Sequence, residues 1–181
     1  MLVASVILCL IVGSQASVPG LCPNVKGEVT DLNEIFGRWY LQKASRNVAD
    51  FTLICTELYW NLPNEYGSSN IVYTSYSKLT KEYVKSVSEA TLNDSGVTIV
   101  YHTPVAGPMS VNRYIFTDNR RQYGIVWSCE NNGTMHDESA FFYSKNPRPN
   151  RGDMQRFINY KLAVLGLNIP KLVDVNTEYC Y

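Results

Sequence analysis

Two histidines are candidates for the base of a Ser-His-acid catalytic site, which needs an imidazole placed beside the nucleophile. They are His102 and His136, and the carboxylates of Asp137 and Glu138 directly follow the second. Both histidines lie near the ends of predicted strands, where a position on the rim explains them. Consecutive polar residues at a turn are usually exposed to water. The sequence therefore favours exposed histidines, and we assign no catalytic residue.

The five cysteines could hold a metal ion or form disulfides. Four of them, Cys22, Cys55, Cys129 and Cys180, lie far apart in the chain and lack the close spacing typical of zinc sites, so no metal site is expected. The fifth, Cys9, lies in an amino-terminal segment that we expect to be removed. The remaining even set supports two disulfides, and the spacing alone leaves all possible pairings open.

The amino terminus has the pattern of a secretory signal peptide. Residues 2–12 are nearly all apolar, and Ser14 and Ala16 have the small side chains typical of a cleavage site. The apolar run is shorter than the roughly 18 residues needed to span a membrane. We therefore expect a signal peptide over residues 1–16, a single domain over residues 17–181, and a secreted, extracellular protein.

If the chain is secreted, two of its tripeptides can be glycosylated. Asn93 and Asn132 each begin an Asn-x-Ser/Thr triplet, which is the acceptor sequence for N-linked glycans. Both are predicted glycosylation sites.

The tripeptide Arg151-Gly152-Asp153 matches the sequence that integrins recognise in adhesion proteins. Asn150 is a good helix N-cap, which places Asp153 in a first helical turn where a carboxylate is favoured. A helical backbone holds the tripeptide in the wrong shape for a receptor, so we do not expect an integrin partner.

Charge and composition exclude other partners. The 181 residues include 16 Lys and Arg against 16 Asp and Glu, so the formal net charge is zero. Proteins that bind nucleic acid need clustered cations to displace counterions from phosphates. The balanced charge argues against nucleic acid and against an anionic membrane surface.

Short runs rich in Tyr, Val, Ile and Thr, separated by turn residues, predict consecutive β-strands. The predicted strands cover residues 38–44, 52–62, 70–79, 83–92, 97–103, 109–118, 123–129 and 137–144. Their even spacing favours a sandwich or an up-and-down barrel, and a barrel removes exposed sheet edges. Beyond Pro147 and Pro149, apolar residues at helical spacing predict a helix that ends near Gly166 and packs on the outside of the sheet.

Three ordered motifs resemble the lipocalin family, with the greatest similarity to the apolipoprotein D and insect bilin-binding branch. They are GRWY at residues 37–40, TDN at 117–119 and SKNP at 144–147, and the similarity extends over essentially the whole mature chain. The motif residues are Gly37, Trp39, Thr117, Asp118 and Lys145. Lys145 stands where the family usually has Arg. It can still make a cation–π contact with Trp39, but without guanidinium stacking the barrel floor is expected to close more loosely.

The resemblance implies an all-β fold: an eight-stranded antiparallel up-and-down barrel with one α-helix outside it near the carboxyl terminus. It also implies disulfides between Cys22 and Cys129 and between Cys55 and Cys180. The implied function is transport of a small hydrophobic ligand, namely a bilin, carotenoid, retinoid, sterol or fatty acid, with no required cofactor and no catalytic step. Two alternatives are a barrel filled by its own side chains that binds other proteins, and a lipocalin isomerase that uses a free cysteine in the barrel.

Strand alternation, anchored by Trp39 pointing inward and Cys55 and Cys129 pointing outward, predicts the lining of the cavity. The candidates are Leu41, Lys43, Leu58, Trp60, Thr74, Tyr76, Ile99, Tyr101, Asn112, Tyr114, Phe116, Val126, Ser139, Phe141 and Tyr143. Lys43 and Lys85 are placed near the rim, where either could pair with a ligand carboxylate. Asn47 begins a loop over residues 47–50 that is a candidate lid. Trp127 has the opposite phase and is predicted to pack beneath the helix.

Overall fold

The computed structural model describes residues 17–46, 52–103, 107–167 and 171–175, together with residues 177 and 180. The predicted signal peptide and Asn47 of the candidate lid lie outside the described residues. Within this part of the chain, no helix is long and apolar enough to cross a membrane.

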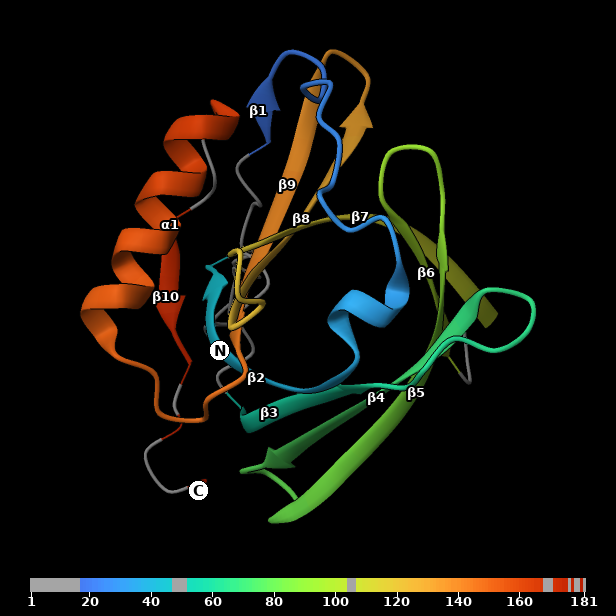
Figure 1. Cartoon of the computed structure of the whole chain (residues 1–181), viewed down its shortest axis with the longest axis vertical. Helices are drawn as coiled ribbons and strands as arrows, with labels where there is room; N and C mark the ends of the chain where they lie inside the picture. Colours follow the sequence, from blue (N-terminus) through green and yellow to red (C-terminus); the bar gives the residue numbers. More distant parts are fainter. Residues whose placement is uncertain are drawn as a thin grey trace, which may run out of the picture.

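Eight long antiparallel strands form a closed barrel (Figure 1). They are β2 (Gly37–Ser45), β3 (Leu53–Trp60), β4 (Ser68–Ser77), β5 (Glu82–Leu92), β6 (Val97–Thr103), β7 (Gly107–Thr117), β8 (Tyr123–Asn132) and β9 (Met135–Ser144). Each strand pairs with the next in sequence, and β9 returns to pair with β2. The predicted up-and-down barrel is confirmed. Two short strands extend it, because β1 (Val18–Pro19) pairs with β9 and β10 (Leu172–Asp174) pairs with β2.

Two irregularities change which side chains face inward. In β2 the pairing with β9 skips Gln42, which makes this residue the extra one of a β-bulge. Lys43 and Ala44 therefore take the faces opposite to those that strict alternation predicts. In β3 the register shifts around Cys55, whose φ of 56° lies in the left-handed region. Each irregularity thus determines which of the residues that follow it face into the barrel.

The helix α1 (Arg151–Leu165) lies alongside the barrel (Figure 1). The side chain of Asn150 accepts hydrogen bonds from the backbone N–H groups of Gly152 at 2.9 Å and Asp153 at 3.1 Å. At the other end, Gly166 adopts a φ of 62°, which glycine tolerates without strain. The predicted N-cap and the helical placement of Arg151-Gly152-Asp153 are confirmed.

The barrel wall separates two apolar clusters. The inner cluster includes Trp39, Leu58 and Ile99, and the outer cluster joins Phe142 of β9 to Phe157 of α1. Trp127 is fully buried in the outer cluster, as the sequence predicts. The helix therefore covers apolar side chains on the outside of the wall without entering the barrel.

Both disulfides have the pairing that the resemblance implies. Cys22 is bonded to Cys129 with a Cα–Cα distance of 5.8 Å, and Cys55 to Cys180 with 5.1 Å. The first attaches the amino-terminal segment to β8, and the second attaches the carboxyl-terminal segment to β3. Both ends of the domain are thus fixed to the barrel wall.

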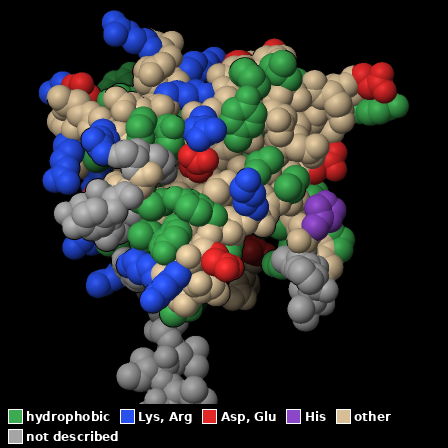
Figure 2. Space-filling model, turned by 90° about the horizontal axis from the view of Figure 1, so that it is seen from below, with side chains coloured by type: hydrophobic (Ala, Val, Ile, Leu, Met, Phe, Trp, Pro, Cys, Tyr) green, Lys and Arg blue, Asp and Glu red, His purple; other side chains and the backbone are tan. Residues whose placement is uncertain are grey.

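The outer surface mixes polar and apolar side chains. Figure 2 shows hydrophobic side chains in several small groups among Lys, Arg and acidic residues on the face that it presents. Asn93 and Asn132 are both exposed, and the amide of Asn93 donates a hydrogen bond of 2.9 Å to the hydroxyl of Thr98. Glycosylation of either asparagine stays a prediction.

Candidate ligand-binding site

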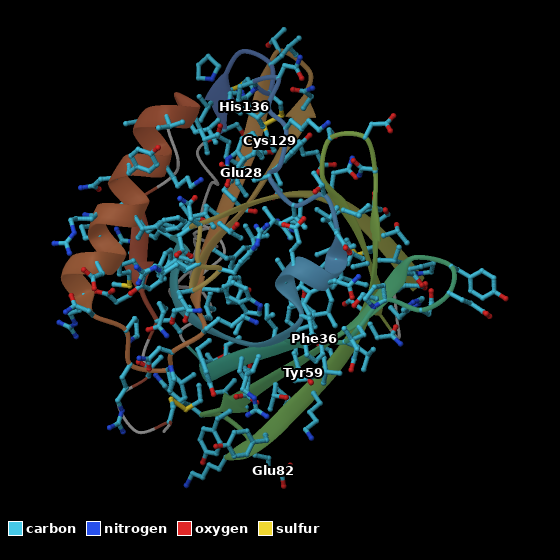
Figure 3. All side chains as sticks on the ribbon, in the orientation of Figure 1. Glu28, Phe36, Tyr59, Glu82, Cys129 and His136 are labelled. Carbon is cyan, nitrogen blue, oxygen red and sulfur yellow. A yellow bond between two sulfur atoms is a disulfide. The ribbon has the colours of Figure 1, made fainter. Side chains whose placement is uncertain are left out.

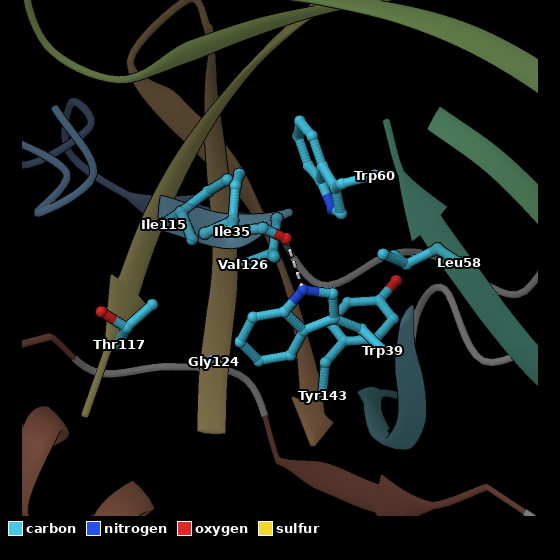
Figure 4. A pocket seen from close by; sticks show the side chains of 9 residues that line it. All are labelled: Ile35, Trp39, Leu58, Trp60, Ile115, Thr117, Gly124, Val126 and Tyr143. Atoms are coloured by element: carbon cyan, nitrogen blue, oxygen red, sulfur yellow. Dashed lines mark hydrogen bonds between the residues drawn. The ribbon is translucent and has the colours of Figure 1, made fainter. Parts of the chain in front are cut away.

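The closed end of the barrel is built around Trp39, whose side chain is 3% exposed. Its indole Nε1–H donates a hydrogen bond of 2.8 Å to the carbonyl of Ile35, in the short 3-10 helix η1 (Leu32–Ile35) (Figure 4). A Cβ at Gly124 would lie 3.4 Å from the indole, so the glycine lets β8 pass close to the ring. η1 and Trp39 together form the floor of the barrel.

Lys145 covers the other side of this floor. Its ammonium lies 4.3 Å from the centre of a Trp39 ring and donates a hydrogen bond of 2.5 Å to the carbonyl of Phe36. Burial lowers the pKa of Lys145 to about 8. Gly37, with a φ of 96°, leaves room for this ammonium, because a Cβ there would meet Nζ at 3.3 Å. The expected cation–π contact is therefore present.

The third part of the floor is the turn between β7 and β8. The hydroxyl of Thr117 accepts a hydrogen bond of 2.6 Å from Arg121, whose guanidinium also pairs with Glu34 of η1. The carboxylate of Asp118 accepts a hydrogen bond of 2.7 Å from the backbone N–H of Tyr123. All three motif segments thus meet at the closed end, where they hold the barrel together.

Above the floor, the barrel encloses a cavity of about 390 Å³. This volume falls within the range typical of sites for small ligands. Its walls are mainly apolar and aromatic, and they consist of Leu41, Ala44, Leu53, Thr56, Leu58, Trp60, Tyr73, Ser75, Ser86, Ile99, Tyr101, Arg113, Val126, Phe141, Tyr143 and Val175. A small space of about 20 Å³ beside Trp39 shares Leu58, Trp60, Val126 and Tyr143 with it and deepens its lower end.

Eight of the predicted residues line this cavity: Leu41, Leu58, Trp60, Ile99, Tyr101, Val126, Phe141 and Tyr143. They come from β2, β3, β6, β8 and β9. At these positions the predicted alternation of inward and outward side chains agrees with the structure. Their contact with a ligand stays a prediction.

On β4 and β7, the residues predicted to point into the barrel do not line the cavity. Thr74 and Tyr76 on β4, and Asn112, Tyr114 and Phe116 on β7, are absent from the lining. Residues paired directly across antiparallel strands share a face. Tyr73 pairs with Leu58 and Ile115 pairs with Val126, so Tyr73 and Ile115 take the inward positions and their sequence neighbours point outward.

The two lysines predicted near the rim lie outside the cavity. Lys43, beyond the bulge in β2, donates a hydrogen bond of 2.6 Å to the carboxylate of Asp174 on β10. Lys85 is exposed and pairs across the sheet with Thr74, on the outer face. Neither lysine lines the cavity, and pairing of either with a ligand carboxylate at the rim stays a prediction.

Two lining residues that the sequence analysis missed make one side of the cavity polar. Tyr73 lies beside Tyr101, with ring centroids 6.1 Å apart, and Arg113 projects from β7. Ser139, which was predicted to line the cavity, lies behind Arg113 and accepts a hydrogen bond of 3.0 Å from its guanidinium. The predicted alternation of inward and outward residues was shifted by one residue in β4 and in β7. Tyr73 and Arg113 were therefore assigned to the outer face.

Solved structures share this architecture. Lobster apocrustacyanin A1 superimposes with a TM-score of 0.71 at 15% identity, over 88% of this chain and 89% of that one. Insecticyanin from the tobacco hornworm Manduca sexta has a TM-score of 0.71 at 14% identity, over 88% of both chains. The major allergen Per a 4 from cockroaches has a TM-score of 0.64 at 18% identity, over 90% of this chain and 98% of that one.

The chain has the lipocalin fold. No family model matches the sequence, and a search of curated proteins finds no relative. The likeness at these identities shows the fold alone, so the function has to be argued from the lipocalin cavity itself.

Burial raises the pKa of Tyr143 in the lipocalin cavity, and the neighbouring Tyr101 adds to the shift. The folded protein keeps this phenolic proton above about pH 10, where the unfolded chain releases it. The free energy of unfolding should therefore fall above about pH 10, by about 1.4 kcal/mol per pH unit for one retained proton. Urea unfolding from about pH 9 to about pH 11 should show a shallower fall for Tyr143→Phe. The exposed control Tyr66→Phe should match the unchanged protein, and equal slopes for all three would contradict the assignment.

His136 and Glu138 are buried, which corrects the expectation of a solvated turn. They are 6% and 8% exposed. The imidazole Nδ1 lies 2.9 Å from the carbonyl oxygen of Gly20, and Nε2 lies 3.2 Å from a carboxylate oxygen of Glu138. Burial raises the pKa of Glu138. The pair fastens the amino-terminal segment to the outside of the lipocalin barrel.

Cys129 completes a cluster with these two residues, whose potential ligand atoms all lie within 4.8 Å of one another. The sulfur of Cys129 is bonded to Cys22, so it is not a thiolate that could bind a metal ion. Figure 3 shows Cys129 and His136 near the top of the view, with Phe36 and Tyr59 well below them. This cluster does not belong to the lipocalin cavity, and neither does His102, which is exposed.

Proposed function

We propose that the protein is a secreted carrier that binds a small hydrophobic molecule inside its barrel without a catalytic step. The observation that carries this proposal is the cavity of about 390 Å³ with mainly apolar and aromatic walls. Burial of apolar ligand surface contributes roughly 25 cal/mol per Å², which supplies the affinity. The few hydroxyl groups in the walls orient the ligand.

The two disulfides support the extracellular part of the proposal, because such bonds persist in oxidising compartments. They also argue against the isomerase alternative, which needs a free cysteine in the barrel. Cys55, on the strand in question, is bonded to Cys180. The cavity argues against the other alternative, a barrel filled by its own side chains.

Among candidate ligands we keep bilins, carotenoids, retinoids, sterols and fatty acids, and the motif resemblance favours a bilin. A bound bilin or carotenoid absorbs visible light, which no side chain does. An absorption spectrum of the protein purified from its native source should therefore show a visible band. A spectrum confined to the aromatic region would remove the pigments and leave the colourless lipids.

Filling the cavity tests the carrier proposal directly. Val126 lies where the cavity meets the small space beside Trp39, so Val126→Phe places a phenyl ring where ligand has to lie. We expect retinol, used as a probe, to quench the tryptophan fluorescence of the unchanged protein saturably. The variant should bind it at least about tenfold more weakly, a loss of about 1.4 kcal/mol.

The matched control is Val87→Phe, which makes the same change on the outer face of β5, where Val87 is 53% exposed. It should bind retinol like the unchanged protein. Circular dichroism and thermal unfolding check that both variants are folded. Saturable quenching that is equally strong in both variants would place the probe outside the barrel and contradict the proposal.

A further inference from the structure

The backbone pairing of β7 with β8 covers only part of the two strands. β7 pairs with β8 from Tyr114 to Thr117, and with β6 from Gly107 to Arg113. A hollow of about 370 Å³ is lined by residues of β7, β8 and β9. Arg113 lines both this hollow and the cavity, so its side chain stands at the boundary between them.

The groups that contact the guanidinium of Arg113 are neutral. One nitrogen, Nη1, donates hydrogen bonds to the hydroxyls of Ser128 and Ser139, the second at 3.0 Å. The carbon of the guanidinium lies 5.5 Å from the centre of the Phe141 ring. The Nε–H group is buried and has no hydrogen-bond partner. The hydrogen bonds of Nη1 therefore fix the side chain, while Nε and Nη2 make no hydrogen bond within the described residues.

No carboxylate among the described residues forms an ion pair with Arg113, although acidic residues line the hollow outside the wall. These are Glu130, Asp137 and Glu138: Glu130 is exposed, Asp137 accepts a hydrogen bond of 2.6 Å from Ser17, and Glu138 pairs with His136. Arg113 is also the one charged side chain among the described residues of the cavity lining. A guanidinium stays protonated at all physiological pH values, so this wall carries a positive charge without a paired anion.

Phenolic hydroxyls lie on the same side of the cavity. Tyr73, Tyr101 and Tyr143 all line it, and the charge of Arg113 acts on Tyr73 and Tyr143 to lower their pKa values against the larger effect of burial. A guanidinium beside phenolic O–H groups offers several donors to one planar anion. Apolar side chains adjoin these tyrosines in the lining, because Leu41 pairs across the sheet with Tyr143 and Leu58 pairs with Tyr73.

We infer that Arg113 binds the carboxylate of an amphipathic hydrophobic acid whose apolar part fills the barrel. This inference rests on the proposed carrier function and narrows its ligand to acids, such as a fatty acid, a retinoid acid or a bilin with propionate groups. The carboxylate neutralises the charge at the boundary of the cavity. Lys43 and Lys85, outside the cavity, play no part in this contact.

Two probes with the same apolar part separate the headgroup from the body of the ligand. Retinoic acid and retinol differ in carrying a carboxylate or a hydroxyl, and both are titrated against the full, disulfide-bonded protein by tryptophan quenching. We expect the unchanged protein to bind retinoic acid about tenfold or more tightly than retinol, because a hydrogen bond to a charged group contributes more than a neutral one.

In Arg113→Met we expect this preference to disappear through weaker binding of the acid, while retinol binding changes by less than about twofold. The hydroxyls of Ser128 and Ser139 keep their own hydrogen bond of 2.7 Å, so the substitution leaves neither without a partner. Arg113→Lys, which retains a charge but not the planar donors, should keep part of the preference. Lys85→Met is the matched control for a lost positive charge, and it should bind both probes normally.

The possible results distinguish a failure of the carboxylate site from a failure of the proposed carrier function. Equal affinity of the unchanged protein for both probes, or an equal loss of both in Arg113→Met, would overturn the carboxylate site and leave the carrier function intact. Failure of the unchanged protein to bind either probe would contradict the carrier function, and the inference would fall with it. The comparison of the two probes in the unchanged protein and in Arg113→Lys decides the matter if Arg113→Met does not fold.

Discussion

Trp39→Ala is expected to destabilise the protein by about 3–5 kcal/mol, the range typical of removing a buried tryptophan. The indole is 3% exposed and occupies the floor of the barrel, where no other side chain can replace its volume. Its loss also removes the ring beneath the ammonium of Lys145 and the donor to the carbonyl of Ile35. Urea unfolding followed by far-ultraviolet circular dichroism measures the change.

Two controls separate the parts of this effect. Trp39→Phe keeps an aromatic ring but loses the hydrogen bond to Ile35, so it should cost less than the alanine substitution. Tyr66→Ala removes an aromatic side chain that is 85% exposed and should change the free energy of unfolding by no more than about 0.5 kcal/mol. A loss below about 1 kcal/mol for Trp39→Ala would show that Trp39 is not the floor of the barrel.

The sequence predicted the architecture well because the strands, their turns and the helix each have a local signal. Asn150 is an N-cap by its own chemistry, and the residues of α1 follow at helical spacing. The three motifs also predicted that Trp39 and Lys145 would meet, which the distance of 4.3 Å confirms. Such features depend on a few neighbouring residues or on a motif, so they can be recognised without knowledge of the packing.

The inward faces of the strands were harder to predict, since alternation has to be anchored separately in every strand. The bulge at Gln42 reverses the phase within β2 and moves Lys43 outside the barrel. β4 contains neither a motif residue nor a cysteine to anchor it. Its phase depends on the register with β3, where Leu58 pairs with Tyr73.

For β7 the sequence did contain a signal. The predicted strands that end at Asp118 and begin at Tyr123 form a hairpin, and continuing that pairing places Tyr114 opposite Trp127. Trp127 was already expected to face outward, so Tyr114 had to face outward as well. The same step would have turned Arg113 inward. Cross-strand consistency, rather than alternation in single strands, is what would have found the one charged residue in the described lining.

Removing the disulfide between Cys55 and Cys180 is expected to cost about 4 kcal/mol and to lower the unfolding temperature by roughly 10 °C. The bond spans 125 positions, so it strongly restricts the unfolded chain. In the folded protein it holds the carboxyl-terminal segment against β3, and Val175 of that segment lines the cavity. The variant Cys55→Ala with Cys180→Ala, studied by thermal unfolding and retinol titration, should therefore lose stability and bind retinol several-fold more weakly.

The bond between Cys22 and Cys129 is a matched control, because its span of 107 positions gives nearly the same restriction of the unfolded chain. Its double alanine variant should lose similar stability but keep its retinol affinity, since neither Cys22 nor Cys129 lines the cavity. Any excess loss of stability in the Cys55–Cys180 variant then measures contacts of the folded tail, including the hydrogen bond of 2.9 Å from Val175 N–H to the carbonyl of Gln42. Unchanged retinol affinity in both variants would show that the backbone pairing of β10 with β2 holds Val175 in the cavity wall without the help of the disulfide.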